Sequence, residues 1–101
     1  MLKLTAAQKS TVCAIVDAHL PRQRVRVFGS RAGLTSTRPI KSFSDLDLLI
    51  FGSTLDNQMR SSLEEAFDES DLPFRVDIAE AARLSPAFLA RIEAQAVELT
   101  D

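Results

Sequence analysis

Residues 45–51 read DLDLLIF, an apolar run that opens with two acids separated by one leucine. Successive side chains of a β-strand point to opposite faces of the sheet. A strand here would therefore put Asp45 and Asp47 on one face and the apolar side chains of Leu46 and Leu48 on the other. The stretch predicts a strand with one face in the core and two carboxylates on the opposite face.

Two shorter stretches with the same alternation lie before and after this strand. Residues 24–28, RVRVF, alternate arginine with valine and end at the dipeptide Gly29-Ser30. Residues 74–78, FRVDI, place Arg75 and Asp77 on one face. Three strands are therefore expected, and Asp77 would join the first two acids if its strand lies beside theirs.

Three further segments have the spacing and the end signals of helices. Thr5 and Gln8 have the form of a capping box at the start of a helix over residues 6–19. Asp56 has the side chain of an N-cap for a second helix, and Pro86 suits the first position of a third. The side chains expected to face the core are Met59, Leu63, Ala66 and Phe67 in the second helix, and Phe88, Ile92, Gln95 and Leu99, with Leu89 and Ala96 alongside, in the third.

The order of these elements is helix, strand, loop, strand, helix, strand, helix. This order predicts the fold class α/β (α+β), a two-layer sandwich of a small mixed sheet with helices packed on it. A length of 101 residues suits one core, so we expect a single domain over residues 1–101. Residues 31–43 show no sustained period and form a long connection before the central strand.

The composition excludes several classes of protein. With 46% hydrophobic and 26% charged residues, and no apolar run near the roughly 20 residues of a membrane span, no membrane association is expected. No signal peptide is visible, and the one cysteine, Cys13, cannot form an internal disulfide, which favours a reducing cytoplasm. The net charge of -2 argues against direct nucleic-acid binding.

The charges are nevertheless unevenly distributed along the chain. Residues 22–41 carry six basic side chains and no acid, whereas residues 64–71 carry five acids and no base. Both runs have the composition of solvated surface. The alternative for the basic run is that it meets an anion.

Asp45, Asp47 and Asp77 are the candidate catalytic and metal-binding residues. Like charges on one face of a strand repel each other, and a divalent cation offsets that repulsion. Mg²⁺ takes carboxylate oxygens and keeps phosphate among its remaining ligands, and three carboxylates can hold two ions that stabilise a phosphoryl displacement. The alternative is a solvated strand with scattered acids.

Gly29 and Ser30, directly after a strand, are candidate nucleotide-binding residues. Glycine lets the backbone approach a phosphate closely, and the serine hydroxyl and nearby N–H groups can donate to its oxygens. Arg31, next to the turn, is the first candidate among the basic residues to meet phosphate charge. Arg38 and Lys41 suit that role and plain loop surface equally well. The alternative for the turn is an ordinary connection.

Three segments taken together resemble a known family: FGSRA at 28–32, SDLDL at 44–48 and LPFRVDI at 72–78. With them the sequence resembles a minimal nucleotidyltransferase (MNT) of the DNA polymerase β-like superfamily, the small proteins encoded beside HEPN-domain proteins. The resemblance implies the polymerase β-like nucleotidyltransferase core. The 14 residues between Ser30 and Asp45 make this loop longer than the common form of the family.

The resemblance also implies roles for individual residues. Gly29 and Ser30 would hold a nucleoside triphosphate, Asp45 and Asp47 would bind Mg²⁺, and Asp77 would complete the metal site and help activate an attacking hydroxyl. Members of the family transfer a nucleoside monophosphate to a hydroxyl and release pyrophosphate. Several act as antitoxins that adenylylate a tyrosine of a HEPN ribonuclease toxin, so ATP is the expected substrate and a HEPN toxin the expected partner.

Two functions follow as alternatives. The first is a Mg²⁺-dependent adenylyltransferase that modifies a partner protein. The second is a non-catalytic antitoxin that neutralises a HEPN ribonuclease by contact alone and keeps a residual nucleotide site. A small α/β regulatory domain without nucleotide function is a third. Because a chain of this length has little surface for an acceptor, the first two both require a partner protein.

Overall fold

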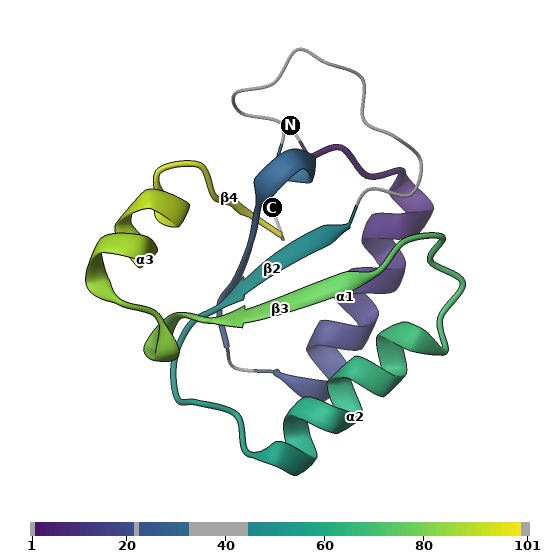
Figure 1. The fold of residues 1–101 in the computed structure, drawn as a ribbon. Helices are drawn as coiled ribbons and strands as arrows, with labels where there is room; N and C mark the ends of the chain where they lie inside the picture. Colours follow the sequence, from purple (N-terminus) through teal and green to yellow (C-terminus); the bar gives the residue numbers. More distant parts are fainter. Residues whose placement is uncertain (1, 22, 33–44, 100–101) are drawn as a thin grey trace.

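The computed structural model describes residues 2–21, 23–32 and 45–99, and Figure 1 shows their arrangement. The elements in chain order are α1 (Ala6–His19), β1 (Val25–Phe28), the 3₁₀ turn η1 (Gly29–Ala32), β2 (Leu46–Ile50), α2 (Asn57–Asp68), β3 (Val76–Glu80), the 3₁₀ turn η2 (Ala81–Arg83), α3 (Pro86–Glu93) and β4 (Val97–Glu98). The strands form one mixed sheet in the order β3-β2-β1-β4. β1 is antiparallel to β2 and β4, and β2 is parallel to β3.

The first helix begins and ends at the residues expected from its end signals. The Gln8 N–H donates to Thr5 Oγ1 at 3.1 Å, and the Thr5 N–H donates to Gln8 Oε1 at 3.0 Å, so the capping box is complete. Leu20 closes the helix as its C-cap, with its N–H donating to Val16 O. The helix predicted over residues 6–19 is confirmed.

α1 and α2 lie side by side and form the layer that covers one face of the sheet (Figure 1). The main core fills the space between this layer and the strands, because the inward side chains of both are apolar. Its fully buried members include Val12, Val27, Leu46, Leu48 and Leu63. Phe67 of α2 is also buried, but Met59 is 42% exposed. The expectation that Met59 faces the core is therefore wrong, because this residue lies in the first turn of α2, ahead of the buried part of the helix.

The opposite face of the sheet is covered at one end by α3. Leu49 points to this face and is fully buried against a small apolar cluster that includes Ile92 and Ala81. Ser85 caps α3, and Pro86 stands at its start, as expected. The predicted sandwich of a small mixed sheet with helices packed on it is thus confirmed, with α3 as an additional cover on the second face.

The chain beyond α3 differs from the expected continuous helix. α3 stops at Glu93, and the next residues enter the sheet as β4, where Val97 pairs with Val27. Leu99 is buried and donates its N–H to Val25 O, whereas Phe88 is 48% exposed. The prediction that one helix carries both Phe88 and Leu99 on its buried side is therefore wrong. No glycine or proline marks this helix end, and the free edge of β1 draws the segment into strand pairing.

The third strand lies two residues later than expected. Strand structure covers Val76–Glu80 rather than 74–78, although the Leu46 N–H already donates to Arg75 O at 2.9 Å. Most of the long connection expected over residues 31–43 lies outside the described residues. Within the described ranges, every helix is too short or too polar to serve as a membrane span.

Candidate active site

The carboxylates predicted to act together project from the face of the sheet that α1 and α2 leave uncovered. Along β2, Asp45 lies just before the strand, Asp47 is its second residue, and Leu49 is already covered by α3. Asp47 pairs with Asp77 in the register of the parallel strands β2 and β3. The structure therefore brings two of the three acids onto adjacent strands, with Asp45 two residues from Asp47 on the same strand face.

Asp47 is the most perturbed titratable group of this face. Partial burial raises the pKa of its carboxyl to about 6, with additional contributions from the negative charges of Asp77 and Asp45. The side chain of Asp77 on β3 is about half exposed, and that of Asp47 on β2 is less exposed. A carboxylate held near like charges at partial burial is typical of a site that receives a cation or a proton.

Gly29 lies against Asp47 so closely that any side chain at this position would have to displace the Asp47 carboxylate. The backbone of Gly29 has a φ of +72°, a conformation that favours glycine, and it opens the turn η1 directly after β1. A Cβ atom built on Gly29 would overlap Asp47 Oδ2. Phe28 pairs with Asp47 across β1 and β2, which explains the close approach. Gly29 and exposed Ser30 therefore lie beside the carboxylates, where the sequence predicted a phosphate turn.

Arg31 lies elsewhere than predicted. The residue is 5% exposed, its guanidinium carbon lies 4.0 Å from the centre of the Phe74 ring, and its Nη1 donates to Lys3 O at 2.9 Å. Burial lowers the pKa of the Arg31 side chain. The side chain therefore fastens the N-terminal segment to the core. The other candidates for phosphate contacts, Arg38 and Lys41, lie outside the described residues.

The donor set of this face has the chemistry of a site for a hard cation. Asp45, Asp47 and Asp77 supply only carboxylate oxygens, the ligand type that Mg²⁺ prefers. Their charges act on one another, as the raised pKa of Asp47 indicates. Among residues 2–21, 23–32 and 45–99, no three side chains of metal-ligating type are already gathered closely enough to hold an ion. These three carboxylates are the ligand type that Mg²⁺ takes and lie on one face of the sheet. In the described residues they are not yet close enough together to hold an ion.

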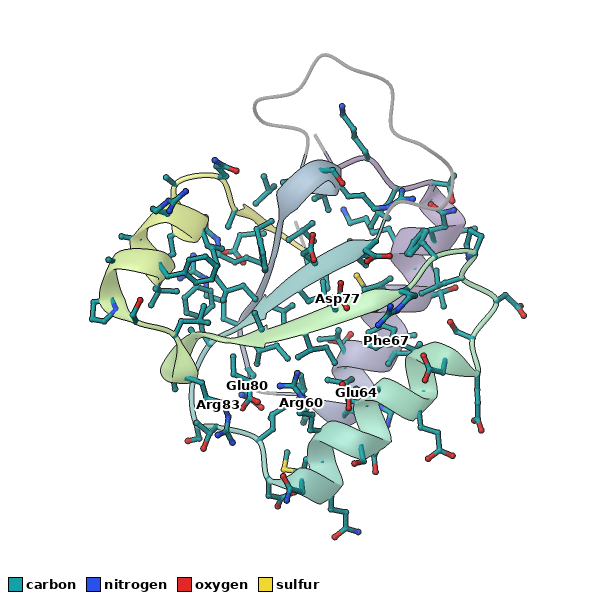
Figure 2. The ribbon with its side chains drawn as sticks, in the orientation of Figure 1. Arg60, Glu64, Phe67, Asp77, Glu80 and Arg83 are labelled. Carbon is teal, nitrogen blue, oxygen red and sulfur yellow. The ribbon has the colours of Figure 1, made fainter. Side chains whose placement is uncertain are left out.

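Sequence reasoning missed a buried acid on the other side of β3. Glu80 is 4% exposed, and its carboxylate accepts the Leu55 N–H at 2.6 Å, Arg60 Nη1 at 2.7 Å and Arg83 Nε at 3.1 Å (Figure 2). Burial alone would raise the pKa of Glu80, but these hydrogen bonds outweigh it and lower the pKa. The signal was present in the sequence, because Glu80 continues the inward positions of Val76 and Ile78 along the strand.

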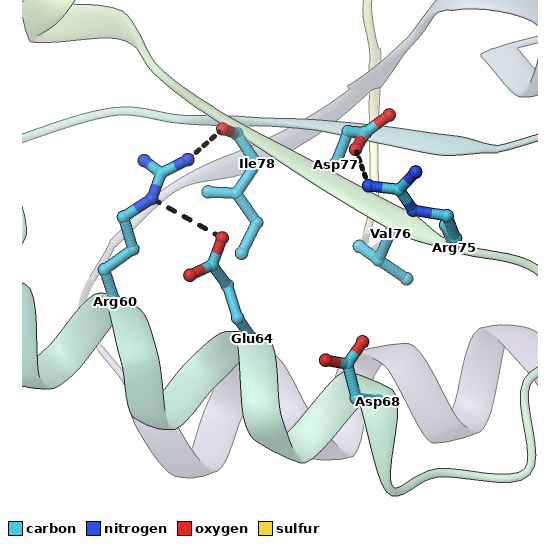
Figure 3. Close-up of a pocket in the computed structure, with 7 residues that line it drawn as sticks. All are labelled: Arg60, Glu64, Asp68, Arg75, Val76, Asp77 and Ile78. Atoms are coloured by element: carbon cyan, nitrogen blue, oxygen red, sulfur yellow. Dashed lines mark hydrogen bonds and ion pairs between the residues drawn. The ribbon is translucent and has the colours of Figure 1, made fainter.

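Arg60 of α2 binds this buried acid and also the backbone of β3, the strand that carries both Glu80 and Asp77. Its Nη2 donates to Ile78 O at 2.8 Å, and its Nε lies 3.7 Å from Glu64 Oε2 (Figure 3). These groups border a hollow of about 360 Å³ between α2 and β3, which is lined by Arg60, Glu64, Asp68, Arg75, Val76, Asp77 and Ile78. Arg75 Nη2 lies 3.9 Å from Asp77 Oδ1; the Arg75 side chain is largely in solvent, and that of Asp77 is about half exposed.

Comparisons with known proteins bear on the family and the fold of the chain. No family model matches the chain. A probable protein adenylyltransferase MntA from Haemophilus influenzae is 39% identical over 88 residues, which are 86% of this chain and 74% of the relative. A solved structure of a putative minimal nucleotidyltransferase superposes with a TM-score of 0.65 at 29% identity and covers 90% of this chain and 88% of its own.

Structures of toxin–antitoxin complexes share the fold at lower identity. A toxin–antitoxin structure with AMP-PNP gives a TM-score of 0.68 at 24% identity, with 90% of this chain and 71% of that chain covered. A complex of a tri-AMPylated Shewanella oneidensis HEPN toxin with an MNT antitoxin gives a TM-score of 0.64 at 19% identity, with 90% and 67% covered. At these identities the two likenesses establish the fold.

Proposed function

The chain belongs to the minimal nucleotidyltransferases of the MNT antitoxin type, and on that premise we propose that it transfers AMP from ATP to a tyrosine hydroxyl of a partner HEPN toxin. The transfer would inactivate the toxin, so the chain would act as an antitoxin. The observation that carries the proposal is the register pair of Asp47 and Asp77, with Gly29 against Asp47.

The relatives support the choice of substrate and partner. The Haemophilus influenzae relative is named a protein adenylyltransferase, and structural relatives include a complex with AMP-PNP and one with an AMPylated HEPN toxin. Residues 1–101 contain no tyrosine, so a tyrosine acceptor would lie outside them. We also propose a cytoplasmic setting, for which the absence of a second cysteine is the support.

We assign each residue of the site a task in the transfer. The turn at Gly29 and Ser30 holds the triphosphate, because the backbone N–H groups of this exposed turn and the Ser30 hydroxyl can donate to its oxygens. Asp45 and Asp47, with Asp77, would hold Mg²⁺, which when bound neutralises phosphate charge. The acceptor oxygen bonds to the α-phosphorus, the bond from the α-phosphorus to the β-phosphate oxygen breaks, and pyrophosphate leaves. Asp77, the most exposed carboxylate of the pair, takes the proton of the acceptor hydroxyl.

The experiment is incubation of a candidate HEPN partner with labelled ATP, Mg²⁺ and the chain. We expect label on a tyrosine of the partner. Asp77→Asn should abolish the label and keep the far-UV circular dichroism spectrum, because the side chain is half exposed. Asp17→Asn, an exposed acid on α1, is the matched control and should transfer normally.

The same experiment separates the enzyme from a contact antitoxin. If the partner stays unlabelled and the double variant Asp45→Ala/Asp47→Ala still neutralises the toxin, then the chain acts by contact alone. If that double variant loses both label and neutralisation while it remains folded, the transfer is the antitoxin activity.

A further inference from the structure

The outer edge of β3 borders two adjoining hollows. β3 is the last strand of the sheet, and among the described residues no strand pairs with its outer side. The first hollow, of about 360 Å³, lies between this edge and α2 (Figure 3). The second, of about 480 Å³, lies at the start of the strand. The two share Asp68, Arg75 and Val76, and we name them together the β3 groove.

The β3 groove reaches the proposed catalytic carboxylates from the side away from the nucleotide turn. Asp77 lines the first hollow, and Asp45 lines the second. Gly29 lies against Asp47 on the opposite side of β2, next to β1. In the plane of the sheet the carboxylates therefore lie between a triphosphate at Gly29 and a chain segment at the edge of β3. Because α2 covers the other face of the sheet, a side chain of that segment reaches the carboxylates around the outer edge of β3.

The charge of the β3 groove selects the kind of segment. Arg60 is offset by the buried carboxylate of Glu80 at 2.7 Å, and Arg75 by Asp77 at 3.9 Å. Asp68 has no ion-pair partner within the described part of the chain, and Figure 3 draws it pointing from α2 toward the groove. The balance is negative, which attracts a basic polypeptide and repels the phosphates of a nucleic acid.

The walls of the second hollow are partly apolar. Phe67, Leu72, Pro73 and Phe74 line it together with Asp45. A tyrosine presents an apolar ring and a polar tip, so it matches a hollow with an apolar wall and a carboxylate at its margin. Among the described residues no strand pairs with the outer edge of β3, so an extended segment can pair with its backbone at the positions other than Ile78 O, which Arg60 binds.

We propose that the β3 groove docks the basic, extended segment of the partner protein that carries the acceptor tyrosine, with Asp68 as a determinant of its binding. The inference rests on the proposed transfer for the identity of the acceptor. It goes beyond it by naming the surface and the charge of the segment that binds there. It also gives a task to the acidic run of residues 64–71, of which Glu64 and Asp68 line the groove.

The test compares two charge reversals on the same helix. Asp68→Lys changes an exposed acid that lines the β3 groove, whereas Glu65→Lys changes an exposed acid of α2 that does not. We expect Asp68→Lys to raise the KM for the partner about tenfold, and to leave the KM for ATP and the kcat at saturating partner unchanged. Glu65→Lys should change the KM for the partner less than about twofold. Circular dichroism verifies that both variants fold.

A binding measurement without ATP tests the docking independently of AMP transfer. Affinity of the Asp77→Asn chain for the partner is measured by calorimetry without ATP, alone and combined with each reversal. Weaker binding with Asp68→Lys only, and a decline of affinity with added salt, supports the groove even if no AMP is transferred. Equal effects of the two reversals, or an effect of Asp68→Lys on the KM for ATP alone, overturns the docking proposal while the transfer activity itself stands.

Discussion

Gly29 lies so close to the carboxylate of Asp47 that a methyl group on Gly29 would overlap Asp47 Oδ2. Gly29 opens the turn after β1 and Asp47 lies in the neighbouring strand β2, so the contact fixes how the turn meets this carboxylate. The position therefore carries two separate demands, a positive φ and an absent side chain.

Gly29→Ala tests both demands at once. We expect a loss of roughly 1–2 kcal/mol in the free energy of unfolding from the left-handed backbone, and a further loss from the overlap with Asp47. Gly52→Ala is the matched control, because Gly52 also has a positive φ, of +100°, while an added Cβ would meet Gln23 Nε2 only at 3.5 Å. Urea denaturation measures both. Equal losses for the two variants would contradict the close approach to Asp47.

Asp47→Asn should stabilise the metal-free chain at neutral pH. The folded-state pKa of about 6 is above the ordinary value, so the folded state holds a proton that the unfolded state has released between about pH 4 and pH 6. Stability from this group therefore falls as the pH rises through that window. The gain from Asp47→Asn should be near zero at pH 4 and on the order of 1 kcal/mol at pH 7.5, after allowance for solvent screening.

The measurement is urea denaturation in buffer with EDTA at several pH values between 4 and 8. Asp17→Asn, an exposed acid, should give a difference from the parent chain that does not vary with pH. A gain for Asp47→Asn that shrinks as the pH rises would contradict the like-charge environment of this carboxylate.

Glu80→Ala should be among the most destabilising single changes. It would leave the Leu55 N–H without its acceptor and two arginines without their shared carboxylate. The buried Leu55 N–H left without an acceptor costs about 1–3 kcal/mol, and the two partly exposed arginines, which solvent can hydrate, add less. Because the pKa of Glu80 is lowered, its contribution is present above the ordinary glutamate pKa and is lost as the pH falls below it.

Thermal unfolding measures the effect of Glu80→Ala, with Glu93→Ala as an exposed control on α3. The two variants should differ strongly at pH 7 and converge toward pH 3. A small loss for Glu80→Ala at pH 7 would mean that the cluster with Arg60 and Arg83 contributes little.

Arg31→Lys distinguishes a structural from a nucleotide-binding arginine. The contact with the Phe74 ring and the hydrogen bond to Lys3 O depend on the planar guanidinium, so we expect a loss of about 1–2 kcal/mol in stability. The KM for ATP should change little in the transfer assay. A raised KM for ATP at unchanged stability would instead restore the contact with phosphate that the position in sequence suggested.

Local patterns predicted most of the fold because they act within single elements. The capping box at Thr5, the N-cap at Asp56 and the proline at 86 each mark a helix start that depends only on neighbouring residues. The alternation in β2 likewise identified the face of Asp45 and Asp47. The sequence pattern of residues 97–98 could not show that they form β4, because this pairing depends on the free edge of β1, which is distant in sequence.

Long-range contacts explain what sequence reasoning missed in the site. Arg31 follows the turn directly and so suggested a phosphate ligand, but the Phe74 ring and Lys3 O, both distant in sequence, hold it in the core. Glu80 looked like an ordinary surface acid at a strand end. Its burial depends on Arg60 and Arg83, which converge on it from α2 and η2.

Because β3 is an edge strand, the candidate site can open locally while the rest of the fold stays intact. Asp77 is held beside Asp47 by the pairing of β3 with β2 and by the hydrogen bond from Arg60 Nη2 to Ile78 O. Local opening of that strand would dismantle the carboxylate pair while α1, β1 and β2 stayed folded. Hydrogen exchange of the β3 amides should therefore report the integrity of the site, and a ligand that bridges the two carboxylates should slow exchange there more than in β1.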